Sequence, residues 1–439
     1  MNRTFTSGLL GRALAGLAVL VGLVAGSAAA AIPGVTGTSV TLTAKPGRII
    51  AGDGQSIYTW GLAVGEDGPM QYPGPTLIVP QGETVSITLR NQLPEPVSLI
   101  FPGQGRITTE GGAPGPLAQE APPGGTVTYT FQATHAGTYL YQSGSHADLQ
   151  VEMGLVGALI VRPSDYSAGS NKVAYSHPDA RYDREYLFFL TDMDKTIHDR
   201  VEDMVRAGQP GPYMVDTTRR FPAYWFINGR MAPDTMAEAN EPGADPFPSQ
   251  PYNSMPGMHP GERLLMRVIG AGLDPHPFHH HGNHARTVAR NGRLLQSAPG
   301  AGADLAVVDF TIPTMPGETY DAIYEWTGKG LGWDIYGHTD SSPGTCLVQH
   351  GEDCDSHGKP FPVSLPDTLK LTIGPNYSGS PFLGALGTLP PGEGGMNANG
   401  GLFFMWHSHN EKEMTNWNIF PGGMMTMVII EPPGAHIME

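Results

Sequence analysis

Short runs in which polar and apolar residues alternate recur along most of the chain and predict β-strands. In Thr84–Leu89 and Thr126–Phe131 every second residue is apolar, as in a strand with one buried face. Further short apolar runs, separated by turn-rich segments, lie at Gly154–Val161, Tyr186–Leu190, Arg263–Ile269 and Met424–Ile430. Helical spacing is clear only near His198–Ala207, which we interpret as a short connecting helix. The pattern therefore predicts an all-β protein built from β-sandwiches.

The strand runs divide into two groups, which indicates two domains. The first group ends at Pro163, where the polar segment Ser164–Asp183 begins. We therefore place one domain at residues 38–163 and a second at 184–434, with long loop insertions around Glu241–Pro260 and Gly384–Gly401. The composition agrees with an all-β fold, because 59 glycines and 41 prolines among 439 residues exclude a long helical bundle.

Residues 1–30 have the pattern of a secretory signal peptide. Arg3 and Arg12 form a basic start, Ala13–Ala25 is largely apolar, and Ala28–Ala30 offers a cleavage site. The apolar stretch is shorter than the roughly 20 residues of a spanning helix. We expect an exported protein, periplasmic or secreted, with no membrane span after cleavage. Because 41 acidic residues outnumber 25 basic ones, we do not expect a nucleic-acid partner.

The chain contains two cysteines, Cys346 and Cys354, and they allow two interpretations. Eight residues apart in an exported chain, they suit one small disulfide loop. With His350 and His357 they also resemble a compact clip for zinc or Cu(I). We favour the disulfide, because the spacing matches no standard zinc motif and the expected compartment is oxidising.

Histidines gather in two motifs late in the chain. The first runs from His276 through His279, His280 and His281, and the second is His407-Ser-His409. Residues two apart in a strand face the same side, so each His-X-His pair can direct two imidazoles at one point. Surface histidines are the plainer alternative, but both motifs lie inside patterned strands. Four imidazoles from two neighbouring strands predict a copper or zinc site.

Around these histidines the chain resembles the multicopper oxidase family, which carries His-Pro-x-His-x-His and His-Cys-His motifs. The resemblance extends over nearly all of the mature chain, at Pro73–Val85, Asn91–Pro96, Gly137–Tyr141, Gly154–Val161 and Phe226–Arg230. It implies two cupredoxin-like Greek-key β-sandwich domains, copper as cofactor, and a small-molecule reductant or dioxygen as partners. The arrangement looks most like the two-domain laccases and copper nitrite reductases, and so implies a homotrimer.

The sequence departs from the family pattern at half of the expected copper ligands. All four first-domain histidine positions are lost, because Ile100 and Pro102 stand in the first motif and Gln142 and Gly144 in the second. Only the displaced His146 could compensate there. The second domain keeps all of its cluster positions, which are His279, His281, His407 and His409.

The blue-copper position is also incomplete. The resemblance places His276 among its ligands, but Ser408 replaces the thiolate, Glu413 the second histidine and Asn418 the axial ligand. A serine hydroxyl cannot form the copper–sulfur bond of a blue site. The expected orienting partners for the imidazoles are Glu411, Glu413 and Asp274.

These departures predict an exported copper protein without a blue copper. The first hypothesis is a copper-dependent oxidoreductase whose metal ligands are His279, His281, His407 and His409, with His276 nearby. The alternative is a non-catalytic copper-binding or copper-buffering cupredoxin protein. A third is a structural cupredoxin whose histidines are relics.

Overall fold

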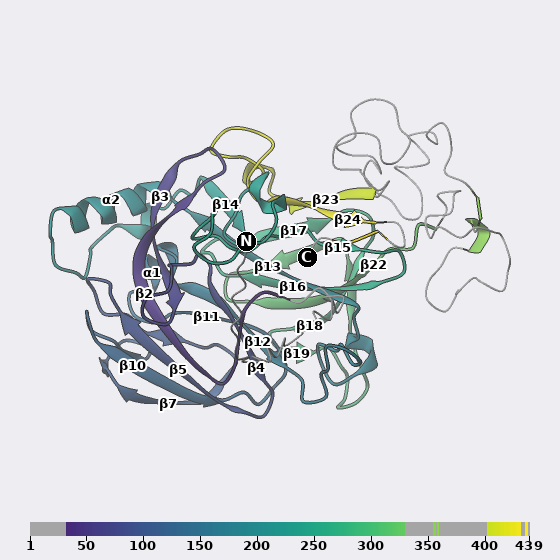
Figure 1. Cartoon of the computed structure of the whole chain (residues 1–439), viewed down its shortest axis with the longest axis horizontal. Coiled ribbons are helices and arrows are strands. Elements are labelled where there is room, and N and C mark those ends of the chain that lie inside the picture. Colours follow the sequence, from purple (N-terminus) through teal and green to yellow (C-terminus); the bar gives the residue numbers. More distant parts are fainter. Residues whose placement is uncertain (1–31, 330–353, 357, 360–401, 432–434, 438–439) are drawn as a thin grey trace, which may run out of the picture.

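The computed structural model describes residues 32–329, 354–356, 358–359, 402–431 and 435–437. These residues form mainly β-strands with few helices (Figure 1), which confirms the all-β prediction. Among them, no helix is both long and apolar enough to cross a bilayer. The predicted signal at 1–30, the loop at Gly384–Gly401, and Cys346, His350 and His357 lie outside the described residues.

The first group of strands forms two five-stranded sheets. In hydrogen-bonded order, one sheet contains β1 (Val35–Thr36), β4 (Gly74–Pro80), β12 (Val156–Arg162), β11 (Gly137–Ser143) and β6 (Leu99–Ile100). The other contains β3 (Ser56–Val64), β2 (Ser39–Ile50), β5 (Thr84–Asn91), β10 (Thr126–Gln132) and β7 (Gly105–Gly111). A small hairpin pairs β8 (Ala113–Pro114) with β9 (Gln119–Glu120). Along β5 and β10 the apolar residues are buried and alternate with more exposed polar ones, as the sequence pattern predicts.

The second group forms a seven-stranded and a five-stranded sheet. The larger contains β14 (Tyr224–Ile227), β13 (Arg184–Met193), β16 (Arg263–Gly270), β22 (Thr319–Glu325), β18 (Ala285–Arg290) and β19 (Arg293–Leu294), with β20 (Val307–Asp309) paired to β18. The smaller contains β15 (Gly257–Met258), β24 (Met425–Ile430), β23 (Leu402–Ser408), β17 (His276–His280) and β21 (Thr311–Thr314). Phe188 of one sheet packs against Phe278 and Trp406 of the other, which places an aromatic core between them.

Helices are short and connect the sheets. They are α1 (Ala147–Glu152), α2 (Lys195–Arg206) and the 3-10 helices η1 (Pro178–Ala180), η2 (Thr217–Arg219), η3 (Asp234–Met236), η6 (Cys354–Ser356) and η7 (Glu411–Glu413). The predicted connector is α2, and it begins three residues earlier than expected. The reason is Asp194, whose side chain accepts a hydrogen bond from the Thr196 amide at 2.9 Å and caps the helix.

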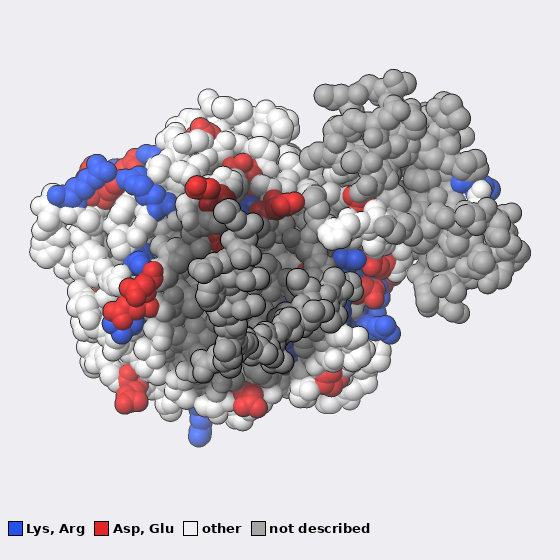
Figure 2. All heavy atoms as spheres, viewed as in Figure 1, with Lys and Arg blue, Asp and Glu red and all other residues white. Residues whose placement is uncertain are grey.

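Charged residues of α2 are paired rather than gathered into a basic patch. Figure 2 shows Lys and Arg over this helix with acidic side chains among them. Lys195 pairs with Asp199 at 2.7 Å and Arg206 with Glu202 at 2.7 Å, both one helical turn apart. Such i,i+4 pairs are ordinary support for an exposed helix.

The two groups of sheets meet at a buried ionic network. Glu185 of β13 lies between Arg162 of β12, at 2.7 Å, and Arg267 of β16, at 2.9 Å. Asp321 of β22 accepts a hydrogen bond from Thr138 of β11 at 2.5 Å. All of these side chains are buried, so the network holds the two groups in one fixed arrangement. The gap between β12 and β13 coincides with our predicted boundary, and the limits 38–163 and 184–434 stay an interpretation.

Candidate metal centre

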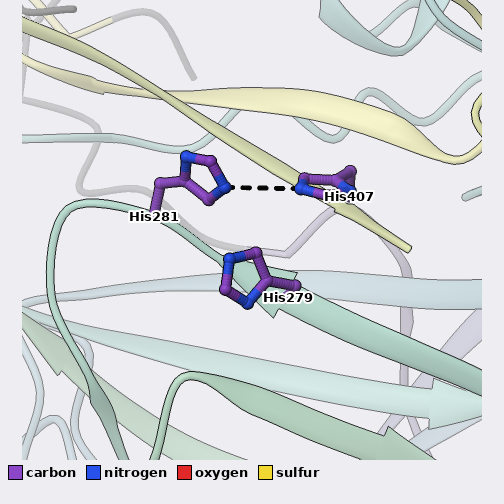
Figure 3. Close-up of side chains that lie close together, drawn as sticks. All are labelled: His279, His281 and His407. Atoms are coloured by element: carbon purple, nitrogen blue, oxygen red, sulfur yellow. Dashed lines mark hydrogen bonds between the residues drawn. The ribbon is translucent and has the colours of Figure 1, made fainter. Parts of the chain in front are cut away.

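Strands β17 and β23 bring the two histidine motifs together. They pair antiparallel with His279 directly opposite His407, and His281 follows β17 immediately. His279, His281 and His407 each offer a ring nitrogen, and these three nitrogens lie within 4.8 Å of one another. Figure 3 shows the three rings converging from the two strands. We call His279, His281 and His407 the imidazole cluster.

The nitrogen positions within the imidazole cluster suit a single metal ion. The Nε2 atoms of His407 and His281 are 3.3 Å apart. Two nitrogens bound to one tetrahedral ion at about 2.0–2.1 Å each are also separated by roughly 3.3 Å. Nδ1 of His407 donates a hydrogen bond to the Ser408 carbonyl at 2.7 Å, so the lone pair of a neutral ring is on Nε2, facing His281. The residues present therefore fit copper or zinc.

Burial keeps these imidazoles neutral. It lowers the pKa of His279 and of His281 to about 4, and the neighbouring imidazoles, which would repel a second charge, lower both further. Burial also lowers the pKa of His407. Neutral imidazole is the form that binds a metal ion, so at neutral pH the cluster is ready for one without losing protons.

His409 lies beside the imidazole cluster rather than within it. Its ring centroid is 4.8 Å from that of His279 and 5.5 Å from that of His407. Its side chain is 52 % exposed, and Nδ1 lies 2.8 Å from a carboxylate oxygen of Glu411. It is close enough to add a fourth imidazole when its Nε2 turns toward the cluster.

His276 lies apart from the imidazole cluster, at the position where the resemblance places the blue copper, and its predicted role as a metal ligand stays a prediction. Side chains alternate between the two faces of a strand, so His276 shares a face with Phe278 and His280. Its ring is buried on this face, opposite to the face of His279. Nδ1 is 2.9 Å from Glu413 and Nε2 is 3.4 Å from Asp192. Burial opposes the charged form, but these two carboxylates outweigh it and raise the pKa of His276 to about 9. Because its ring lies on the opposite face of β17 from His279, we omit His276 from the imidazole cluster.

The other blue-copper positions hold a hydrogen-bonded network. Ser408 is buried beside Phe278, and its hydroxyl accepts a hydrogen bond from the Asn410 amide at 3.2 Å. The side-chain amide of Asn410 in turn donates to Glu413 at 2.8 Å, while Asn418 is exposed. The His276 imidazolium and its two carboxylates therefore occupy the region where the resemblance places a copper.

The first-domain positions bring no imidazole to the cluster. Ile100 and Gln142 are paired between β6 and β11, so the two degenerate motifs do lie side by side. His146 precedes α1 and directs Nδ1 toward Glu95 at 3.6 Å. That carboxylate is the largest cause of the raised pKa of His146. His146 does not replace the lost ligands in the described structure.

Two residues near the cluster were not predicted from the sequence. Thr311 of β21 pairs with His279, and its hydroxyl lies 2.9 Å from His279 Nδ1. Phe310 places its ring edge against both His279 and His284 and is 54 % exposed. Neither belongs to a motif, since both arrive through pairing with a distant strand.

Of the predicted orienting groups, Glu411 and Glu413 contact imidazoles, whereas Asp274 lies 3.5 Å from Arg220.

Cys354 is disulfide-bonded, which favours the disulfide interpretation over a metal clip. Its predicted partner Cys346 lies outside the described residues.

Comparisons with known proteins identify relatives for part of the chain. A family model for multicopper oxidases matches residues 69–166. Laccase-3 of Botryotinia fuckeliana is 29 % identical over 219 residues, which is 49 % of this chain and 41 % of the laccase. Copper resistance protein A of Escherichia coli is 26 % identical over 278 residues, 58 % of this chain and 42 % of that protein. The matched region thus spans about two fifths of these relatives' length.

Solved structures share the fold over most of the chain. A blue copper oxidase from Nitrosomonas europaea superimposes with a TM-score of 0.53 at 20 % identity, covering 89 % of this chain and 85 % of its own. The multicopper oxidase mgLAC also gives 0.53, at 18 % identity, covering 91 % and 87 %. At these identities the likeness concerns the fold alone. Together with the sequence matches, it supports the assignment of the chain to the multicopper oxidase family, whose members bind copper.

Proposed function

We propose that this chain is a copper-dependent oxidoreductase that holds copper at His279, His281 and His407, with His409 completing the site. The observation that carries the proposal is the convergence of three ring nitrogens within 4.8 Å. Similarity to multicopper oxidases supports copper over zinc, because the relatives include laccases and a copper resistance protein. Copper bound there would supply one-electron redox chemistry.

The surroundings of the centre support direct contact between copper and a small-molecule substrate. His409 is half exposed, and Phe310 provides an accessible aromatic edge beside His279. A phenolic or other small reductant can pack on that edge while Thr311 and the Ser408 carbonyl keep two of the imidazoles in place. Electrons would enter at this centre, because a buried ionic network stands where the family has its blue copper.

One observation favours the alternative of a copper-binding or copper-buffering protein without turnover. The His276–Glu413 contact at 2.9 Å replaces the electron-entry site, and the first domain contributes no imidazole. Such a protein would bind copper at the same cluster but would not transfer electrons to dioxygen.

Oxygen consumption by the copper-loaded protein separates the two functions. With a phenolic reductant present, we expect one copper per chain and oxygen uptake that is lost in the H281A variant. H135A is the matched control, because His135 is an exposed histidine far along the chain from both motifs. Stoichiometric copper without uptake would establish the buffering alternative. Failure to retain copper would contradict both.

Export and assembly are further parts of the proposal. The relatives' copper chemistry suits a periplasmic or secreted protein, as the pattern at residues 1–30 predicts. A homotrimer is supported by exposed apolar side chains in and around β20, namely Leu305, Val307 and Val308, because a second copy of the chain would cover them.

A further inference from the structure

A hairpin turn of the second group of sheets contacts the first group and places an arginine at their junction. Strands β18 and β19 are joined by Asn291 and Gly292, whose φ angles of 52° and 69° are both positive, as a tight type I′ turn requires. The Gly292 carbonyl accepts a hydrogen bond from the Tyr139 hydroxyl of β11 at 3.4 Å. A Cβ atom at Gly137 would lie 2.7 Å from the Cα atom of Gly292, so a larger residue there would push the two backbones apart. Arg293 directly follows the turn, and its backbone is therefore fixed at the junction.

A groove of about 740 Å³ lies at this junction. Its lining includes Gln81 from the first group of sheets, Tyr175 and His177 from the segment that links the groups, and Arg293 and Gln296 from the second group. Concave sites of this volume at contacts between domains are where proteins usually bind small molecules. None of the cluster histidines lines the groove, so it is separate from the imidazole cluster.

The groove presents a cation that has no partner in the protein. Arg293 is exposed, and among the described residues its guanidinium forms no hydrogen bond or ion pair. No carboxylate belongs to the part of the lining that the described residues form. The whole chain, by contrast, has a formal net charge of −16 at pH 7. An uncompensated guanidinium in a hollow of an acidic protein favours the binding of an anion.

The polar side chains of the groove are held by the protein through one group and keep another for a ligand. The side-chain amide of Gln81 donates a hydrogen bond to a backbone carbonyl at 3.0 Å, which leaves its side-chain oxygen as an acceptor. The side-chain oxygen of Gln296 accepts from a backbone amide at 3.2 Å, which leaves its NH₂ group as a donor. His177 Nδ1 accepts from the Asp179 amide at 3.2 Å, so the neutral ring carries its hydrogen on Nε2.

These features fit a ligand with one carboxylate and several hydroxyl groups. The planar guanidinium of Arg293 matches a carboxylate through two parallel hydrogen bonds. It balances one negative charge, whereas a phosphate monoester carries about −1.5 to −2 charges at neutral pH. A hydroxyl group both donates and accepts, so it suits the oxygen of Gln81 and the NH₂ group of Gln296. Sugar acids combine these groups with apolar C–H faces, for which Tyr175 and Leu294 provide packing surface in the groove.

We propose that this groove binds a sugar acid, with the carboxylate on Arg293 and the hydroxyl groups on Gln81 and Gln296. The ligand is a free sugar acid or one residue of an acidic polysaccharide, since both present the same chemical groups. The proposal goes beyond the oxidoreductase function and does not depend on it, because no cluster histidine takes part.

Calorimetric titration of the protein with galacturonate tests the site. We expect one galacturonate per chain, and neutral galactose should bind at least about tenfold more weakly because it lacks the carboxylate. R293Q should lower the galacturonate affinity by about tenfold or more, since hydrogen bonds between charged groups are roughly twice as strong as neutral ones. R293K keeps the charge but loses the planar fork, so its affinity should be intermediate.

R200Q is the matched control, because Arg200 is an exposed arginine of α2 outside the lining of the groove. It should bind galacturonate like the parent. Arg293 is exposed as well, so R293Q should fold, and its circular dichroism spectrum checks this.

A titration with trigalacturonate identifies the source of the ligand. Tighter binding than that of galacturonate supports a polysaccharide, and equal binding supports a free sugar acid. Three results would overturn the proposal: no binding of galacturonate, unchanged galacturonate affinity in R293Q, or tighter binding of inorganic phosphate than of galacturonate. Each of these can occur with the copper centre intact, so they are distinguishable from a failure of the proposed function.

Discussion

The H407A variant should lose Cu(II) affinity by about a hundredfold or more. His407 contributes one of three converging nitrogens, and its Nε2 is the atom that faces His281 at 3.3 Å. Outer-shell changes alone cost about 10- to 100-fold in metal affinity, so removal of a direct ligand should reach or exceed the upper end. A hundredfold loss corresponds to about 2.8 kcal/mol. Titration with Cu(II) under a competing chelator measures it.

Two other histidines serve as controls for H407A. His135 is exposed in the first group of sheets, and H135A should bind copper like the parent. His280 is buried on the core face, where its Nε2 accepts a hydrogen bond from the Ala285 amide at 2.9 Å. H280A should therefore lower affinity less than H407A. Equal affinities in H407A and H280A would show that the strand-face argument is wrong.

The H276Q variant should be less stable than the parent by about 3–5 kcal/mol at pH 6. The His276 imidazolium lies between Glu413 and Asp192, and all three side chains are buried. Removing one partner of a buried ion pair typically costs this much, because Glu413 is left without its cationic partner, while Asp192 still pairs with Arg220. Urea unfolding of both proteins measures the difference in free energy.

The pH dependence of this difference has a definite sign. The pKa of His276 is raised from 6.5 to about 9 in the folded protein. The stabilisation is therefore fully present below pH 6.5 and is lost as the pH rises through about 9. A shift of this size corresponds to a linkage of about 3 kcal/mol. Parent and variant should converge toward pH 10, and a difference that stays constant from pH 6 to 10 would contradict the imidazolium.

The sequence alone was sufficient for the strands and for the shared face of His279 and His281. Alternation is a local property with a period of two, so Val85, Ile87 and Leu89 mark the buried face of β5 without knowledge of its partner. The same rule correctly directs His279 and His281 to one side.

His276 was predicted at the separate blue-copper position, and its role as a metal ligand stays a prediction. An interval of three residues from His279 reverses the strand face, where Glu413 contacts the His276 imidazole. His409 was predicted only in part, because β23 ends at Ser408 and strand alternation does not continue beyond it. Its ring consequently lies at the rim of the cluster.

The residues that complete the surroundings of the centre depend on long-range pairing. Thr311 reaches His279 because β21 pairs with β17. Nothing in the local sequence indicates which strands become neighbours. The ionic network of Glu185, Arg267 and Arg162 was hidden for the same reason, since Arg162 comes from the first group of sheets and the other two residues from the second.

The combined optical and electron-spin-resonance spectrum of the Cu(II)-loaded protein tests the central claim most directly. With imidazoles as ligands and Ser408 in place of a thiolate, we expect one Cu(II) per chain with nitrogen couplings and without intense blue absorption. H281A should abolish this signal, while H135A should retain it. An intensely blue protein, or nitrogen-coupled copper that persists in H281A, would contradict the assignment of the centre to His279, His281 and His407.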